Sequence, residues 1–414
     1  MPDLRQLART LFDAAVAAAD PALALRRAFA DHPPPQATGR TILIAVGKAA
    51  PAMLAEAMAL CPGADTAIAV THHENPAEVP GAQVLRAGHP VPDEAGAAAA
   101  RAVIEALKAC GPGDRVIALI SGGGSALLPA PAPGLTLADK AAVNRALLAA
   151  GLDIVQMNLV RQQLSQLKGG GMLRLAAPAT VTAYILSDVI GDDLRAIASG
   201  PTVGPIGTRA EARALLRDAG LWDDLPLKVR AHLSDDTPAA PVPEAVNHLI
   251  GSNRQSLEAM ARAAAQAGLA TRIVSDRLTG DVADAARVVL AELAPVAEPT
   301  ALLFGGETTV NLTGTGMGGR NQELALRVAL DAPGIGNDWV FLSGGTDGRD
   351  GPTEAAGGLV DGATAERIAA AGQDAKALLA DNDSHAALDA AGDLLITGAT
   401  GTNVADVQAL LIRP

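Results

Sequence analysis

The chain is poor in aromatic residues and in cysteine, and each shortage excludes a class of protein. Only seven of its 414 residues are Phe, Trp or Tyr, so we expect no base-stacking platform for single-stranded nucleic acid. The two cysteines, Cys61 and Cys110, exclude a disulfide scaffold and a zinc site built from several cysteines. We therefore expect a core of Ala, Leu, Val and Ile. We also expect the protein to reside in a reducing compartment.

Excess positive charge and long apolar runs are also lacking. With 32 Lys and Arg against 45 Asp and Glu, the formal net charge is −13, which is unlike a nucleic-acid-binding protein. The longest charge-free run, 116–138, contains three consecutive glycines and three prolines, so it is not a continuous membrane-spanning helix. The pattern over 4–18 predicts an amphipathic helix, and Asp13 interrupts any apolar core of a signal peptide there. We expect a cytoplasmic protein without nucleic-acid or membrane partners. The sequence does not decide whether the chain forms a homo-oligomer.

Short apolar runs that end in glycine-rich loops recur along the chain, which is 49% hydrophobic. Ala/Leu-rich stretches with helical spacing separate them. This alternation predicts an α/β protein with parallel sheets covered on both faces. The predicted strands are 41–46, 116–120, 181–186, 301–304 and 339–342, and the clearest predicted helices are 93–109, 139–150, 253–267 and 280–293.

Proline-rich sequence near 233–247 interrupts the periodic pattern and predicts a domain boundary. We place one domain at 1–235 and a second at 245–414. In open α/β sheets, ligands bind outside the carboxyl ends of the strands. A single glycine-rich loop is as easily a tight turn, but five such loops after five strands favour a shared ligand site.

The loop Ser121-Gly122-Gly123-Gly124-Ser125 is the best candidate for a phosphate cradle. Consecutive glycines let backbone N–H groups approach an anion closely. The loop lacks the Lys-Ser/Thr ending of an ordinary P-loop, and Gly47-Lys48 is followed by Ala49. Lys48 directly follows a buried strand, where an ammonium group can help to hold a negative oxygen; a solvent-exposed lysine is the alternative.

A second loop, Gly314–Gly319, matches the dinucleotide pattern G-x-G-x-x-G but lacks its context. The segment before it is polar at alternate positions, and no acidic residue closes the next strand. Arg320, at the start of the following predicted helix, could hold a carboxylate or phosphate through two hydrogen bonds. The alternative for Arg320 is a surface arginine that pairs with its neighbours.

Acidic residues at the predicted strand ends are candidates for metal binding and proton transfer. Asp188 and Asp192 follow one strand and fit magnesium, which takes one or two protein carboxylates beside a phosphate. Glu307 and Asp347 follow two further strands and could position a ligand or accept a proton. His89 could simply hydrogen-bond a rigid turn. The residues alone thus predict an α/β enzyme that binds a small phosphorylated ligand with magnesium.

Nine motifs, in order and at the expected spacing over nearly the whole chain, resemble those of the glycerate 2-kinase family. They are Val46-Gly47-Lys48-Ala49, Ser121 to Leu127, Ser187 to Asp192, Ser199-Gly200-Pro201-Thr202, Gly251-Ser252-Asn253, Gly305 to Val310, Gly318 to Glu323, Ser343 to Gly348 and Thr397 to Asn403. Each glycine motif is weak alone, and none departs from the family's pattern.

The resemblance implies a Rossmann-like N-terminal domain, a smaller MOFRL-type α/β C-terminal domain and an active site in the cleft between them. It implies ATP-dependent phosphorylation of D-glycerate, normally at the 2-hydroxyl, with a divalent cation such as Mg²⁺. Lys48 and Arg320 match the family's proposed catalytic basic residues, and the 121–125 loop matches its nucleotide-phosphate segment. We add Asn253, Glu307 and Asp347 as nucleotide contacts, Asp188 as a catalytic residue, and Asp188 with Asp192 as magnesium ligands.

The expected mechanism is phosphoryl transfer in a site assembled from both domains. Lys48 and Arg320 would balance charge on the transferring group, and Asp188, Asp192 or Asp347 would orient the hydroxyl. Two alternatives remain open at this point. One is a reductase that reduces hydroxypyruvate with NADH or NADPH, and the other is a non-catalytic nucleotide-binding protein.

Overall fold

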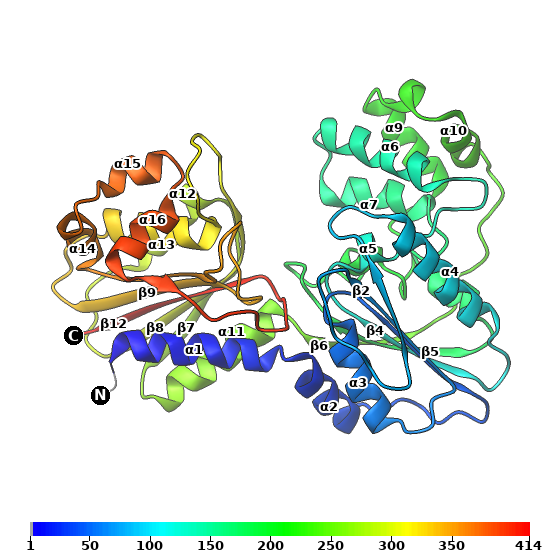
Figure 1. Cartoon of the computed structure of the whole chain (residues 1–414), viewed down its shortest axis with the longest axis horizontal. Coiled ribbons are helices and arrows are strands. Elements are labelled where there is room, and N and C mark those ends of the chain that lie inside the picture. Colours follow the sequence, from blue (N-terminus) through cyan, green and yellow to red (C-terminus); the bar gives the residue numbers. More distant parts are fainter. Residues whose placement is uncertain (1–2) are drawn as a thin grey trace. The chain divides into compact units, whose positions relative to one another are not determined.

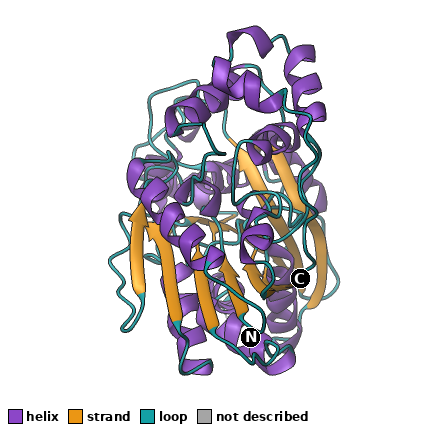
Figure 2. Ribbon diagram, turned by 90° about the vertical axis from the view of Figure 1, so that its right-hand side faces the viewer, coloured by secondary structure: helices purple, strands orange, loops and turns teal. Residues whose placement is uncertain are grey.

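The computed structural model describes residues 3–414 and divides the chain into two compact units (Figure 1). One unit spans 24–250, and the other joins the segment ending at Leu23 to 251–414. Each unit contains one six-stranded sheet. Helices and strands alternate through both units (Figure 2), which confirms the predicted α/β class.

The sheet of the 24–250 unit has the strand order β3-β2-β1-β4-β5-β6. The pairs β3/β2, β2/β1, β1/β4 and β4/β5 are parallel, which is the Rossmann arrangement. The order reverses between β1 and β4, the point where such sheets bind their ligands. The strands are β1 (Thr41–Val46), β2 (Thr66–His72), β3 (Gln83–Ala87), β4 (Arg115–Ile120), β5 (Thr180–Leu186) and β6 (Val246–Gly251).

Apolar residues cover both faces of this sheet, which explains the unbroken apolar runs of its central strands. Ile42 and Ile44 pack into a core with α4, whereas Leu43 and Ala45 pack into another with α3. A third, smaller core joins α6, α7, α9 and α10. The helices of this unit are α2 (Pro21–Asp31), α3 (Ala50–Leu60), α4 (Glu94–Lys108), α5 (Gly124–Leu127), α6 (Leu137–Ala149), α7 (Ile154–Gln163), α8 (Gly171–Ala176), α9 (Arg209–Asp218) and α10 (Leu227–Leu233), with the 3₁₀ turns η1 (Ile197–Ser199) and η2 (Trp222–Asp224).

The second sheet is mixed, which differs from the parallel sheet predicted from its apolar runs. Its order is β11-β10-β9-β12-β8-β7. Only β7 and β8 pair in parallel, and the other four pairs are antiparallel. The strands are β7 (Ala270–Asp281), β8 (Thr300–Thr309), β9 (Asp338–Gly345), β10 (Gly357–Asp361), β11 (Leu394–Leu395) and β12 (Asp406–Arg413).

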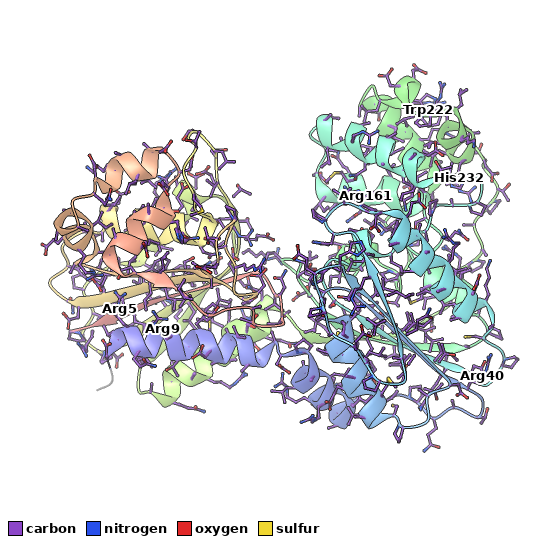
Figure 3. All side chains as sticks on the ribbon, viewed as in Figure 1. Arg5, Arg9, Arg40, Arg161, Trp222 and His232 are labelled. Atoms are coloured by element: carbon purple, nitrogen blue, oxygen red, sulfur yellow. The ribbon has the colours of Figure 1, made fainter. Side chains whose placement is uncertain are left out.

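The first helix belongs to the second sheet, although the chain position suggested the N-terminal domain. The buried face of α1 (Leu4–Ala18) includes Leu11 and Phe12, which share a core with α11 and with β8, β9 and β12. Arg5, labelled in Figure 3, pairs with Asp361 and Asp393 in the same unit. The other helices of this unit are α11 (Asn253–Gln266), α12 (Val282–Glu292), α13 (Arg320–Asp331), α14 (Thr364–Ala370), α15 (Ala375–Ala380) and α16 (Ser384–Ala391).

The observed units therefore differ from the 1–235 and 245–414 division in two places. Residues up to Leu23 leave the first unit because the apolar face of α1 completes the other core. Strand β6 joins the first unit because it pairs beside β5. The predicted proline-rich break lies in the loop that precedes β6.

Two predicted loops are instead the ends of strands. Gly305 lies within β8, and Gly344 lies within β9. A Cβ atom at Gly305 would lie 2.0 Å from Asn253 Oδ1, and one at Gly344 would lie 2.7 Å from Phe12 Cε2. Glycine is thus required there for close packing rather than for a turn. Among residues 3–414, no helix is long and apolar enough to cross a membrane.

Candidate active-site loops

The loops after β1 and β4 lie side by side in the 24–250 unit. The last residues of the two strands, Val46 and Ile120, are paired in the parallel sheet. The backbone N–H of Lys48 donates to Gly122 O at 2.9 Å, and Ala49 N–H donates to Ser121 Oγ at 3.1 Å. Lys48 is therefore held against the glycine loop that was predicted to cradle phosphate.

Three side chains surround the glycines of this loop. A Cβ atom at Gly122 would lie 2.2 Å from Asp188 Oδ2. One at Gly123, where φ is +84°, would lie 3.1 Å from His89 Cδ2 and 3.4 Å from Lys48 Cγ. The structure thus brings Lys48, Asp188 and the predicted loop together at one edge of the sheet. Glycine is needed here both for backbone conformation and for space.

His89 was singled out in the sequence only as a residue of a rigid turn. In the structure it lies beside the glycine loop, where burial and the positive charges of Lys48 and His72 lower its pKa. At neutral pH its ring is therefore uncharged, so one ring nitrogen donates a hydrogen bond and the other accepts one. The signal available in the sequence was its position in a loop that follows another strand, β3, of the same sheet.

Ser125, the last residue of the predicted loop, has partners of its own. Its Oγ accepts a 2.6 Å hydrogen bond from Lys168 Nζ and lies 3.0 Å from Ser199 Oγ. Lys168 was not selected in the sequence. Its partner Ser125 lies 43 residues away, so no local pattern reveals the contact.

The predicted magnesium ligands are placed only in part. Asp188 lies against Gly122, whereas Asp192 lies four residues further on with a left-handed backbone (φ +56°). Among residues 3–414, no group of three or more His, Cys, Asp or Glu side chains is arranged to hold a metal ion. A magnesium ion at Asp188 would therefore take most of its oxygen ligands from nucleotide phosphates and water, as this ion commonly does.

Arg320 is fixed by two carboxylates in the second unit. Its Nε and Nη2 donate to the two oxygens of Asp406 at 2.6 and 3.0 Å, and its Nη1 lies 3.0 Å from Glu307 Oε1. Asp406 begins β12, which pairs with both β8 and β9. The mixed sheet therefore places Asp406 at the same edge as Glu307 and the start of α13.

Electrostatics at this site are set by burial as well as by pairing. The side chain of Asp406 is 2% exposed, and burial raises its pKa to about 6 although Arg320 opposes the shift. Burial disfavours the charge on Arg320, but the hydrogen bond and charge of Asp406, with the charge of Glu307, raise the pKa of Arg320 overall. Arg320 is thus a permanent, oriented positive charge.

Asp350 explains how α13 presents Arg320. Its carboxylate accepts hydrogen bonds from the backbone N–H groups of Asn321 (3.1 Å) and Gln322 (2.8 Å) at the start of the helix. Burial raises the pKa of Asp350 against these hydrogen bonds. Sequence reasoning missed both Asp350 and Asp406 as site residues. Asp406 had one visible signal, because it is a lone acid at the start of an apolar strand.

The remaining predicted contacts in this unit lie near the same sheet edge. Asn253 is buried, and its amide nitrogen donates to the carbonyls of Val404 and Asp406 at 2.9 and 2.7 Å. It therefore anchors the start of β12. Asp347 lies in the loop after β9 and accepts a hydrogen bond from Arg349 N–H at 3.0 Å. Their assignment to nucleotide binding remains a prediction.

The glycines of the G-x-G-x-x-G loop pack against a second loop of the same unit. Cβ atoms at Gly314, Gly316 and Gly318 would lie 2.2 to 2.4 Å from atoms of residues 381–384. Backbone hydrogen bonds also join the two segments, including Gly316 N–H to Asp381 O at 2.9 Å. These glycines are explained by close packing of two loops, which needs no bound dinucleotide.

Comparison with known proteins identifies the family. A domain of unknown function (DUF4147) matches residues 7–234, and the MOFRL family matches 300–406. A D-glycerate 2-kinase of Thermotoga maritima is 40% identical, covering 90% of this chain and 91% of that protein. The chain belongs to the glycerate 2-kinase family. A crystal structure of a glycerate kinase from the same organism superimposes with a TM-score of 0.92 at 37% identity, covering 99% of each chain.

Members of the glycerate 2-kinase family do not all carry the same functional name. A protein of Agrobacterium vitis that is 43% identical, over 99% of this chain and 94% of its own length, is called a putative hydroxypyruvate reductase. The two names describe different reactions, so the residues of this chain have to discriminate between them. The resemblance drawn from the nine motifs is confirmed at the level of the family and the fold.

Proposed function

We propose that the protein is a kinase that transfers the γ-phosphoryl group of ATP to D-glycerate, at the 2-hydroxyl, with magnesium as the divalent cation. Its family includes a D-glycerate 2-kinase that is 40% identical to it. The observation that carries the proposal is the contact of Lys48 with the glycine loop at the switch point of a parallel sheet. This arrangement offers backbone N–H groups and a cation where such sheets bind phosphates.

Phosphoryl transfer depends on positioning and charge balance more than on covalent chemistry by the enzyme. In the proposed mechanism, backbone N–H groups of the glycines 122–124 hold phosphate oxygens, and Lys48 offsets charge on the transferring group. The uncharged ring of His89 contributes a hydrogen bond without adding charge. Arg320 is the second catalytic cation that the resemblance to the family implies.

Arg320 suits recognition of the acceptor. A guanidinium has five N–H donors, and contacts with Asp406 and Glu307 use three of its groups, Nε, Nη2 and Nη1. The remaining N–H donors have a fixed direction because the other side of the group is anchored. They can hold the carboxylate of glycerate or an oxygen of the transferring phosphoryl group.

Asp188 is the residue that fits a magnesium ion. Its carboxylate lies against the glycine loop, and hard oxygen ligands beside phosphates are what Mg²⁺ prefers. The bound ion would neutralise phosphate charge. We also assign Asp188 the orientation of the acceptor hydroxyl, and the assignment of Asp192 to the same ion has no supporting contact among the described residues.

The reductase name has one sequence feature in its favour, the G-x-G-x-x-G loop, and that loop is packed against residues 381–384. The first turn of the Rossmann-like sheet, Gly47-Lys48-Ala49, also lacks the dinucleotide pattern. Reduction of hydroxypyruvate by NADH or NADPH is therefore the less favoured candidate.

One assay separates the two reactions. The purified protein is given ATP with a panel of small hydroxy acids, with and without magnesium, and ADP release is measured. In parallel it is given hydroxypyruvate with NADH or NADPH, and loss of absorbance by the reduced cofactor is followed. We expect magnesium-dependent ADP release with D-glycerate and no oxidation of either cofactor. Phosphorus NMR of the product then distinguishes 2-phosphoglycerate from 3-phosphoglycerate.

A further inference from the structure

Three basic side chains gather beside Ser125, outside the residues assigned to the reaction above. Lys140 lies on α6, Arg161 on α7, and Lys168 in the loop that follows α7. Arg161 is labelled on α7 in Figure 3. The 3₁₀ turn η1, which carries Ser199, contacts both α5 and α7. The basic group is thereby connected to the glycine loop through Ser125 and Ser199.

Hydrogen bonds connect Lys168 of this basic cluster to a chain of neutral side chains. Lys168 Nζ donates to Ser125 Oγ at 2.6 Å, and Ser125 Oγ lies 3.0 Å from Ser199 Oγ. Ser199 Oγ in turn donates to Asn158 Oδ1 at 3.3 Å. These groups are neutral, so they satisfy the lysine without balancing its charge.

The charges of the cluster have no protein counter-ion. Among residues 3–414, no carboxylate forms an ion pair with Lys140, Arg161 or Lys168. Arg161 donates to the neutral oxygen of Asn144. The Nζ atom of Lys140 is buried and has no hydrogen-bond partner among the described residues. Such a group is costly to bury unless something else supplies the missing acceptor.

The three side chains also interact electrostatically. Burial, together with the charges of Lys140 and Arg161, lowers the pKa of Lys168 well below its usual range. Burial and the charge of Arg161 lower the pKa of Lys140 to about 8. Repulsion between buried cations is relieved when an anion binds among them. The half-buried Ser125 joins Lys168 of this cluster to the glycine loop.

We propose that Lys140, Arg161 and Lys168 form, next to Ser125, a binding site for an oxyanion with more than one negative charge. A single carboxylate would leave part of the positive charge unbalanced, so phosphate chemistry fits better than a carboxylic acid. In the working enzyme the anion is a phosphate group of the nucleotide. This last identification rests on the proposed kinase function, whereas the anion site itself does not.

The test uses the full chain and inorganic phosphate as the probe. Binding is measured by titration calorimetry and by the shift in thermal unfolding, at pH 7 and constant ionic strength, for the wild type and for Lys140→Met. We expect phosphate to bind the wild type and to raise its unfolding temperature. In Lys140→Met the affinity should fall roughly tenfold or more, which corresponds to losing one charged hydrogen bond.

The same variant carries its own check on folding. Without ligand, Lys140→Met should unfold at the same temperature as the wild type or higher, because a buried unpaired ammonium group is removed. Lys168→Met gives an independent second variant at the other side of the cluster. Lys108→Met is the matched control, since Lys108 is exposed on α4 of the same unit. Equal phosphate affinity in the wild type and in both cluster variants would overturn the proposal.

Further arms identify the source of the anion. ADP, a non-hydrolysable ATP analogue and D-glycerate are titrated in turn into the wild type and Lys140→Met. A weakened affinity for the nucleotides alone supports the nucleotide phosphate, with KM for ATP raised and KM for D-glycerate unchanged. A weakened affinity for D-glycerate alone would overturn the assignment to the nucleotide. Phosphate binding that depends on Lys140 in a protein without kinase activity would reject the proposed function and leave the anion site standing.

Discussion

The two units hold the positive charges of their candidate sites in opposite ways. In the second unit, Arg320 is fixed between Asp406 and Glu307, so its charge is largely balanced before any ligand binds. In the 24–250 unit, the Lys140 Nζ atom and the Lys168 side chain are buried, and neither has a carboxylate partner among the described residues. A balanced arginine gives direction but little net attraction, whereas an unbalanced pair of lysines attracts anions strongly.

This difference fits the division of labour in a kinase. A nucleotide triphosphate brings several negative charges, and an unbalanced cationic site in the protein can offset them. A small hydroxy acid brings one carboxylate, for which orientation matters more than charge. The comparison can be broken or sharpened by experiments on each unit in turn, beginning with the largest expected effect.

The contrast between the two units is simplest to interpret if their cores unfold independently, and Phe12 tests whether they do. Its side chain is 1% exposed and packs in the core of the second unit. Phe12→Ala should lower the stability of that unit by about 4 kcal/mol, the usual cost of such a cavity. The protein has two tryptophans, Trp222 in the 24–250 unit and Trp339 in the second unit. Replacing one of them by Phe leaves the other as the reporter for the unfolding of its own unit.

We expect urea unfolding followed by Trp339 to shift in Phe12→Ala, while unfolding followed by Trp222 stays nearly constant. Phe29→Ala is the reciprocal control, because Phe29 packs in a core of the 24–250 unit. Equal shifts of both reporters in both variants would mean that the units unfold as one body, contrary to this expectation.

The two cations assigned to the reaction should have large and similar effects on turnover. Lys48→Ala and Arg320→Ala are each expected to lower kcat roughly 100-fold or more, as removal of a charge-stabilising group usually does. ADP release with D-glycerate is the measurement. Arg287→Ala, at a 76% exposed side chain of the second unit, should leave kcat within about twofold by the small effect of surface pairs. Turnover like that of the wild type in both variants would exclude these roles.

The unbalanced lysines predict a particular pH dependence of stability. The pKa of Lys140 is lowered from 10.5 to about 8 in the folded chain, so between these values the unfolded chain binds more protons. The free energy of unfolding should therefore rise with pH across this window, by about 3 kcal/mol from this residue. Lys140→Met should lack this rise.

This dependence is measured by urea unfolding of wild type and Lys140→Met at several pH values between 7 and 10.5. The difference between the two proteins isolates the contribution of the one lysine from that of other groups. A difference that is constant across the window, or that falls with pH, would contradict a buried, uncompensated ammonium group.

The glycine loop should be sensitive to one added methyl group. In Gly122→Ala the new Cβ would lie 2.2 Å from Asp188 Oδ2, so loop or carboxylate must move. We expect KM for ATP to rise roughly tenfold, equivalent to about 1.4 kcal/mol. Gly204→Ala is the matched control, since a Cβ there meets no atom within 4 Å. Nucleotide affinities that differ less than twofold between the two variants would remove the loop from the site.

The parts of the fold that sequence predicted well are those with a single local signature. Strand β1 was predicted to the residue and β4 and β5 to within one, because strands buried on both faces are continuously apolar. Strand β7 was missed because it is polar, half-exposed and irregular in register between Ile273 and Leu278. The antiparallel entry of β12 between β9 and β8 was also missed, since strand direction depends on long-range pairing.

The same distinction applies to the candidate site. Lys48 and the 121–125 loop could be selected because each directly follows an apolar run. Asp406 and Lys168 could not, because their roles depend on partners 86 and 43 residues away. Sequence therefore singles out the groups proposed to face a ligand more readily than the residues that hold those groups in place.

The placement of β12 has a consequence for how the protein is made. This strand lies in the interior of its sheet, yet the ribosome synthesises it after every other strand. The 24–250 unit is fully translated much earlier and can fold while synthesis continues, as domains generally do. The apolar face of α1 packs on α11 and on β8, β9 and β12, so during that interval these partners have not yet been synthesised.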